Sequence, residues 1–222
     1  MTEIVVFVEG GGNNATLQAE LRQGFDALFR LEKSRASERR TGLRFVCCGS
    51  RNEACDAFID SLNRQRKKIS ALLVDSETSI SPASTDSAKD AKTRIEHLRQ
   101  KTATDGRGQG DGWPLPNVQH ERVHLMVQCM EAWIVADPEA LESIYKKKFR
   151  RQKLPARPIL EYEPKADIFA KLEAATKDTQ MGKYSKIDHA SRILAMIDPN
   201  KVAKRCPRFA IFRQWLTETI EG

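Results

Sequence analysis

The segment EIVVFVEGGGNN, residues 3–14, places an almost continuous apolar run directly before a glycine-rich turn. Three further runs have the same strand character, namely LRFVCC (43–48), ISALLV (69–74) and VHLMVQ (123–128). Strands that are apolar on both faces are typical of parallel sheets that helices cover on both sides. These runs therefore predict four strands of a mainly parallel sheet.

Amphipathic segments lie between these runs. Residues 15–31 carry an apolar face, and residues 54–62 carry a second one. Such stripes are typical of helices that pack on a core. The alternation of strand and helix predicts an α/β domain with right-handed crossovers over residues 1–137.

The rest of the chain divides into two regions. Residues 78–117 contain Ser/Thr-rich and Gly-rich stretches around a short helical segment, 88–100. They are predicted to form a long, mobile excursion from the sheet edge, which either closes over a site or is disordered. Residues 138–222 are predicted to form a helical part packed on or beside the α/β domain, with helices at 138–148, 164–177, 184–197 and 207–220.

The amino-acid composition indicates the class of protein to which this chain belongs. The 222 residues are 40% apolar and 30% charged, and the mean hydropathy is -0.52, which is typical of a soluble globular protein with no membrane span. The N-terminus has no basic leader or cleavage site, so we expect a cytoplasmic protein. The five cysteines are odd in number and form no CxxC pair, which predicts reduced thiols.

The positive charge is unevenly distributed. The chain carries 37 Lys and Arg against 30 Asp and Glu, a net charge of +7. Residues 138–222 contain 18 of the basic and 11 of the acidic residues, which accounts for the whole excess. This asymmetry indicates either a polyanionic partner or a solvated basic face.

Acidic side chains follow two of the predicted strands. Glu9 comes directly after the first strand, and Asp75 and Glu77 come at the end of the third. Ligands of open α/β sheets bind beyond the carboxyl ends of the strands, so these acids would converge if the two strands are neighbours. Clustered carboxylates favour Mg²⁺ or Mn²⁺. The alternative for a single acid here is a helix cap or a loop residue.

The glycine run does not match a nucleotide-binding motif. Gly10 and Gly11 are followed by neither GK[ST] nor a GxGxxG spacing. The run either forms a tight turn into the first helix or binds a phosphate through backbone N–H groups.

Several other residues are candidates for the same site. Arg51 follows the second strand and is either a phosphate clamp or an exposed arginine at a helix start. Glu131 follows the fourth strand and is either a further metal ligand or a glutamate favoured by the helix dipole. Lys183, Lys186 and His189 are predicted to lie along one flank of a helix, where they either contact phosphate or form a solvated flank with His189 packed against the rim of the core.

Two more patterns lie in the C-terminal part. The basic run Lys146, Lys147, Lys148, Arg150, Arg151 and Lys153 resembles a tract that binds nucleic acid or a partner. The aromatic stripe Phe209, Phe212 and Trp215 has helical spacing, and we predict that it belongs to the core rather than to a base-stacking surface.

The runs VFVEGGGNN and LLVDSE resemble the Toprim superfamily, whose signature is a Glu after the first strand and a DxD-type motif after the third. The segments VHLMVQCMEAWIVADPEAL and GKYSKIDHA resemble small stand-alone Toprim proteins, often encoded beside an AAA or ABC-type ATPase in prokaryotic defence islands. One departure is Asp75-Ser76-Glu77 in place of the usual Asp-x-Asp. The resemblance implies a Toprim (Rossmann-like) fold.

The resemblance also implies roles for the acids. Glu9 would be the general acid/base or a metal ligand, and Asp75 and Glu77 would bind Mg²⁺. Toprim topoisomerases need a separate Tyr-bearing domain and primases need further regions, which leaves a hydrolytic nuclease, a class that includes the OLD-type Toprim proteins. It would be the effector of an ATPase-controlled anti-phage defence module. The alternatives are a non-catalytic scaffold or regulatory subunit that binds an ATPase or nucleic acid, and a phosphotransferase, which the missing P-loop lysine disfavours.

Overall fold

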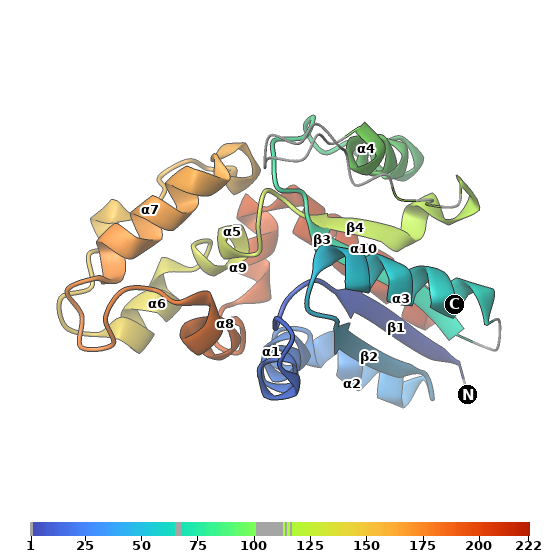
Figure 1. The fold of residues 1–222 in the computed structure, drawn as a ribbon, viewed down its shortest axis with the longest axis horizontal. Coiled ribbons are helices and arrows are strands. Elements are labelled where there is room, and N and C mark those ends of the chain that lie inside the picture. Colours follow the sequence, from blue (N-terminus) through green and yellow to red (C-terminus); the bar gives the residue numbers. More distant parts are fainter. Residues whose placement is uncertain (1, 65–67, 101–112, 114, 116) are drawn as a thin grey trace.

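The computed structural model describes residues 2–64, 68–100, 113, 115 and 117–222 (Figure 1). Among these residues, four strands form one parallel sheet in the order β2-β1-β3-β4. The strands are β1 (Glu3–Val8), β2 (Gly42–Cys47), β3 (Lys68–Asp75) and β4 (Val123–Met126). The prediction of an α/β fold with a mainly parallel sheet is confirmed.

The register places two strand ends side by side. β1 lies between β2 and β3, and Val8 is paired with Cys47 on one side and Leu73 on the other. The Glu9 N–H donates a hydrogen bond to the Leu73 carbonyl, 3.1 Å away. The chain therefore leaves β1 and β3 at neighbouring positions of the same sheet edge.

Helices cover both faces of the sheet. On one face, α1 (Ala15–Leu28), α2 (Arg30–Glu38) and α10 (Pro207–Glu221) pack on a core that includes Ile4, Val6 and Val8. On the other face, α3 (Arg51–Asn63) and α4 (Ser87–Gln100) pack on Leu72 and Val74. Residues that alternate along each strand thus enter different hydrophobic clusters, as the pleat of a strand requires.

The remaining helices lie mostly beyond the sheet. They are α5 (Glu131–Ile134), α6 (Pro138–Tyr145), α7 (Lys165–Thr176), α8 (Lys186–Leu194) and α9 (Pro199–Arg205), with 3₁₀ turns at Asn117–Arg122, Arg151–Lys153 and Leu160–Tyr162. In Figure 1, α6, α7 and α8 lie to the left of the sheet. Their apolar residues belong to the same cluster as those of α1 and β1, so the C-terminal part shares the core of the sheet.

The aromatic stripe of α10 lies in this core. Phe209 and Phe212 are fully buried, and their rings pack 5.5 Å and 5.4 Å from that of Phe29. Trp215 is partly buried and stacks on Phe212. The predicted core role of the stripe is confirmed.

Three predicted helices have different bounds. The segment 15–31 is divided at Phe29, where the chain turns this ring into the core before α2 begins. The segment 138–148 stops at Tyr145 because Lys146 adopts a left-handed φ of 57°. The segment 184–197 begins at Lys186 because the Ser185 side chain caps the helix. The sequence patterns also missed α2, α5 and α9 as separate helices.

The region 78–117 differs from its prediction. α4 is the short helix expected at 88–100, but its Ala91, Ile95 and Leu98 side chains are buried against the sheet. The prediction of a mobile excursion is therefore wrong for α4, because these apolar residues recur at helical spacing. Residues 101–112, 114 and 116 of the predicted excursion lie outside the described residues.

Buried ion pairs join α4 to α10 around the edge strand β4. Nη2 of Arg208 lies 3.1 Å from Asp90 Oδ1, and its Nη1 lies 3.3 Å from Glu161 Oε2. Arg94, also on α4, pairs with Asp90 and donates to the Val123 carbonyl of β4. These side chains are almost fully buried. The cluster therefore links α4 and α10, which cover opposite faces of the sheet, to the edge strand β4.

Every helix in the described ranges is too short or too polar to cross a membrane.

Candidate metal centre

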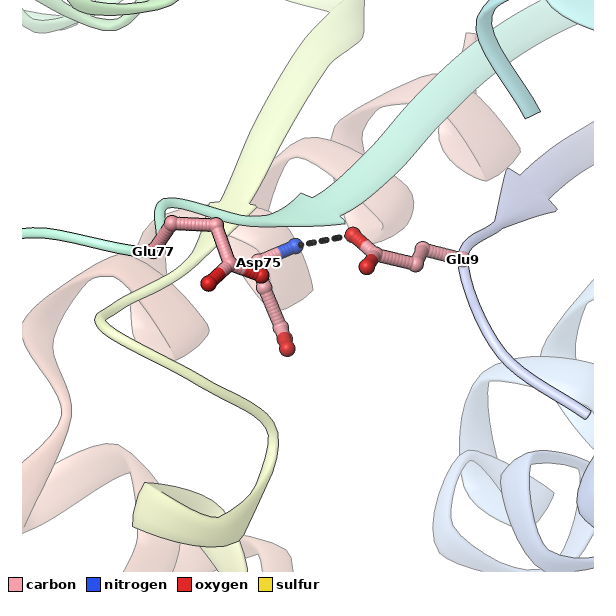
Figure 2. Close-up of side chains that lie close together, drawn as sticks. All are labelled: Glu9, Asp75 and Glu77. Carbon is pink, nitrogen blue, oxygen red and sulfur yellow. Dashed lines mark hydrogen bonds between the residues drawn. The ribbon is translucent and has the colours of Figure 1, made fainter. Parts of the chain in front are cut away.

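Three carboxylates converge at the carboxyl ends of β1 and β3. One oxygen from each of Glu9, Asp75 and Glu77 lies within 4.8 Å of the other two. Figure 2 shows the three side chains pointing into the same space, with the Asp75 N–H donating to Glu9 Oε2 across 3.1 Å. The convergence expected from the strand order is present in the structure.

The backbone holds each acid in place. Asp75 ends β3, and its Oδ1 accepts a hydrogen bond from the Met130 N–H at 2.8 Å. Glu77 adopts a left-handed φ of 66°, and its N–H donates to the Gln128 carbonyl at 2.9 Å. A positive φ is unfavourable for a residue with a side chain, so the surrounding structure must impose it. The segment after β4 therefore positions both acids of the Asp75-Ser76-Glu77 motif.

Asp75 is the most buried of the three acids. It is 1% exposed, and its Oδ2 atom has no hydrogen-bond partner among the described residues. Burial raises the pKa of Asp75 to about 7, although the ammonium of Lys186 favours the charged form. Burial also raises the pKa of Glu9, against the opposing effect of Arg51. Both acids therefore bind a proton more tightly than free carboxylates do.

We expect divalent-metal affinity to rise with pH up to about 7 and to level off above it. A metal must displace the proton of Asp75 at lower pH, because the pKa of this acid is about 7. Calorimetry with Mn²⁺ at pH 6 in two buffers of different ionisation heat should show proton release. At pH 8.5 that release should vanish. Affinity that is constant from pH 5.5 to 8.5 would contradict a role for Asp75 as ligand.

Arg51 lies against the acids. It is the first residue of α3, and its Nη1 donates to Glu9 Oε2 at 3.2 Å and to the Asp75 carbonyl. Its guanidinium lies 5.0 Å from the centre of the Trp113 ring. The alternative of an exposed arginine is therefore wrong, because the neighbouring acid and ring enclose this side chain. The phosphate-clamp role stays a prediction.

Two lysines also face the centre. Nζ of Lys186 lies 3.7 Å from Asp75 Oδ2, and Nζ of Lys165 lies 2.6 Å from Glu77 Oε2. Burial alone would lower the pKa of each ammonium, but the facing carboxylates outweigh it and raise both pKa values. The lysines therefore stay charged and balance much of the negative charge.

Sequence reasoning missed Lys165. It is the first residue of α7, as Lys186 is of α8. A cation is disfavoured at this position by the helix dipole, so a lysine there has to be stabilised by something else. Two helices that both begin with lysine were thus a signal for an acidic partner outside the helix.

Glu131 is a further buried acid, and its charge acts on Asp75. It is fully buried, its Oε1 accepts a hydrogen bond from the Tyr184 hydroxyl at 3.0 Å, and Nζ of Lys186 lies 3.9 Å away. Its Oε2 has no hydrogen-bond partner among the described residues. Burial and the carboxylate of Glu131 raise the pKa of Tyr184, which keeps its hydroxyl a donor. The helix dipole alone does not account for such a network, and the role of Glu131 as a further metal ligand stays a prediction.

Residues 8–217 match a protein family described as "Domain of unknown function (DUF4276)". The chain belongs to the DUF4276 family. No curated protein and no solved structure matches it significantly. The matched range of this DUF4276 chain contains every residue of the centre described above, and the resemblance to Toprim proteins stays a prediction.

The predicted flank of Lys183, Lys186 and His189 is not formed in this DUF4276 chain. Lys183 precedes α8 and is largely exposed, 3.8 Å from Glu173. His189 is buried, with the Tyr145 hydroxyl 2.9 Å from its Nδ1. His189 therefore packs at the core, as the alternative expected, and of the three side chains Lys186 reaches the centre.

The glycine run of the DUF4276 chain forms a turn. The Gly10 N–H donates to the Gly49 carbonyl at 2.8 Å, so its predicted binding of phosphate is wrong. The Asn14 side chain accepts from two N–H groups of the first turn of α1, which removes them from binding as well. A Cβ on Gly11 would lie 2.7 Å from the Gln18 Cα, so this turn packs too closely on α1 for a side chain. A phosphate contact by Gly11 stays a prediction.

The basic run at residues 146–153 lies on the surface. Arg150 pairs with Asp178 at 2.6 Å, and Arg151 pairs with Glu139. Internal ion pairs therefore use part of the charge, and the role of the tract in binding stays a prediction.

We expect the Lys165→Met variant to bind Mn²⁺ about tenfold more tightly than the wild type, because an ammonium that neutralises Glu77 is removed. Calorimetry at pH 8 measures the affinity. Lys183→Met is the matched control, since Lys183 lies outside the centre, and it should leave binding unchanged. Weaker binding by Lys165→Met would contradict competition between the ammonium and the metal.

Proposed function

We propose that this protein is a Mg²⁺- or Mn²⁺-dependent nuclease that hydrolyses phosphodiester bonds. The observation that carries the proposal is the convergence of three carboxylates around the buried Asp75. Its Oδ2 atom lies 3.7 Å and 3.8 Å from the ammonium groups of Lys186 and Lys165 but has no hydrogen-bond partner among the described residues. Leaving such a group unsatisfied costs about 1–3 kcal/mol, and more when it is charged. A bound cation would offset this cost.

The donor set fits a hard cation. Glu9, Asp75 and Glu77 offer carboxylate oxygens, which suit Mg²⁺ or Mn²⁺ better than zinc. Cys129 is close to these acids, but burial raises the pKa of its thiol above the usual range, so it offers no thiolate. When bound, such a metal polarises the phosphoryl oxygen and stabilises the leaving oxygen.

The cationic side chains suit a phosphodiester substrate. Arg51, Lys165 and Lys186 all contact the carboxylates, and the two lysine side chains are 30% and 39% exposed. A divalent ion bound by the acids would free these ammonium groups to contact phosphate oxygens. Arg51 offers a planar fork for the same purpose. Glu9, with its raised pKa, is the group suited to accept a proton from the attacking water.

The distribution of charge and the resemblance to Toprim proteins support proposals about binding partners. The net charge of +7, concentrated in residues 138–222, suits a nucleic-acid substrate in the cytoplasm. The resemblance to stand-alone Toprim proteins supports an effector of an anti-phage defence module, controlled by an AAA or ABC-type ATPase. The alternative is a non-catalytic scaffold or regulatory subunit that binds the ATPase or nucleic acid.

Glu9→Gln tests the proposal. We expect about a 100-fold loss of cleavage of DNA or RNA in Mg²⁺, because the amide cannot take the proton. Melting temperature and circular dichroism should match the wild type. Glu96→Gln, at an exposed position of α4, is the control and should keep full activity.

Two outcomes would separate the alternatives. A wild type that cleaves and a folded Glu9→Gln variant that cleaves equally well would contradict the role of Glu9. A wild type that neither cleaves nor binds Mn²⁺ would favour the scaffold. Mn²⁺ binding that disappears in Asp75→Ala/Glu77→Ala, without cleavage, would indicate an effector that needs its partner.

A further inference from the structure

A pocket of about 430 Å³ lies beside the carboxylate centre, between α1 and α8. Leu17 and Leu21 line it from α1, and Ile187 lines it from α8. The pocket shares Glu9 and Lys186 with the centre. A group bound there would therefore be a direct neighbour of a phosphate held by Lys186.

Several polar groups of the pocket wall are already paired. The N–H and C=O of Gly10 both bond to Gly49, and the Gly12 carbonyl accepts from the Gln18 side chain at 2.7 Å. The Ser191 hydroxyl donates to the Glu20 carbonyl. The walls thus offer a largely apolar surface, with the charged side chains of Glu9, Glu20 and Lys186 among the lining residues.

Ile187 is an exposed apolar residue in the wall of this pocket. Its side chain is 63% exposed, whereas the apolar residues Ala190, Ile193 and Leu194 of the same helix are buried. It directly follows Lys186, which faces the acids. This isoleucine therefore adds exposed apolar surface to the pocket directly beside the charged centre.

We propose that this pocket holds the base of the nucleotide next to the cleaved phosphate, and that the substrate is therefore nucleic acid with unstacked bases. This inference rests on the proposed nuclease function. The apolar surface of a nucleic acid is mainly the faces of its bases, and stacking covers those faces in a duplex. Single strands and loops leave them free to enter a pocket of this size.

The pocket also predicts how the base is recognised. Since apolar surface makes up most of the lining, the contact with a base is mainly apolar and base identity is read weakly. We therefore expect the protein to prefer single strands to duplexes, with little preference for one base sequence over another. Whether the sugar is ribose or deoxyribose is an outcome of the same experiment when it is run with RNA and DNA.

Binding measurements test the pocket without relying on cleavage. Fluorescence anisotropy in Ca²⁺, which takes the same hard ligands, compares a single strand, its duplex and an abasic strand of equal length. We expect the wild type to bind the single strand about tenfold more tightly than either of the others. Ile187→Ser should lose this preference and keep its affinity for the abasic strand. Ile187→Leu, the matched control, should retain it.

The outcomes separate the two proposals. Equal binding of normal and abasic strands, or an Ile187→Ser variant that keeps the preference, would contradict the proposal that the pocket binds a base. Mg²⁺-dependent cleavage in the same preparations would still support the proposed nuclease. A preference that depends on Ile187 in a protein that does not cleave, even with a candidate partner added, would support the pocket and count against the nuclease. If the protein bound none of the three nucleic acids, both proposals would be contradicted. An apolar side chain of a protein partner would then be the expected occupant of the pocket.

Discussion

Asp75→Asn is expected to abolish the proposed nuclease activity while the protein stays folded. The amide keeps the size of the side chain and can still accept from the Met130 N–H, but it places an N–H group where Oδ2 faces Lys165 and Lys186. A lost metal ligand removes several kcal/mol of transition-state stabilisation, which corresponds to a decrease of about 1000-fold in rate. Cleavage in Mg²⁺ and Mn²⁺ binding are the measurements.

The control for this variant is Asp60→Asn. Asp60 is an exposed residue of α3 that pairs with Arg64, so its neutralisation should change neither activity nor metal binding. If Asp75→Asn cleaves within tenfold of the wild type, Asp75 is not a ligand, and the unpaired Oδ2 atom needs another explanation.

Arg208→Met should destabilise the protein by about 3–5 kcal/mol, because it leaves the buried Glu161 without its cation and leaves Asp90 with Arg94 alone. Arg208 contacts Asp90 on α4 and Glu161, and its backbone N–H also donates to Glu161 at 2.6 Å. Urea denaturation measures the free energy of unfolding. Lys204→Met, at an exposed position of α9, should stay within about 0.5 kcal/mol of the wild type.

The destabilisation by Arg208→Met should depend on pH. Burial raises the pKa of Glu161 to about 7, so this acid is charged above that pH and neutral below it. An acid whose pKa is raised by folding stabilises the fold at low pH and loses that contribution as pH rises. The variant should therefore be less destabilised at pH 5 than at pH 8. Adding Glu161→Gln should restore part of the loss at pH 8, and a strictly additive double variant would contradict the ion pair.

The sheet and the acidic cluster were predictable for one physical reason. Apolar runs identified the strands, and parallel strands bring their carboxyl ends to one edge, so Glu9 and Asp75 had to be neighbours once β1 and β3 were adjacent. The left-handed backbone of Glu77 is a local feature that no periodicity reports.

The cationic half of the centre was harder to predict. Lys165 and Lys186 reach the acids from helices far along the chain, and in sequence they look like any lysine on a helix surface. Lys183 and His189 were assigned to the site because their spacing from Lys186 was interpreted as one flank of a helix. Lys183 lies before α8, and the spacing does not show which face of the helix packs on the core, so it could not predict that His189 is buried.

The order of these elements along the chain matters while the protein is being made. Glu9 and Asp75 leave the ribosome early, whereas Lys165, Lys186 and α10 follow only after the whole sheet. Until α10 has been synthesised, this face of the sheet is covered by α1 and α2 alone, and the carboxylates repel one another without their lysines. A nascent chain therefore has no assembled centre, and the proposed nuclease would stay inactive until translation of the chain is almost complete.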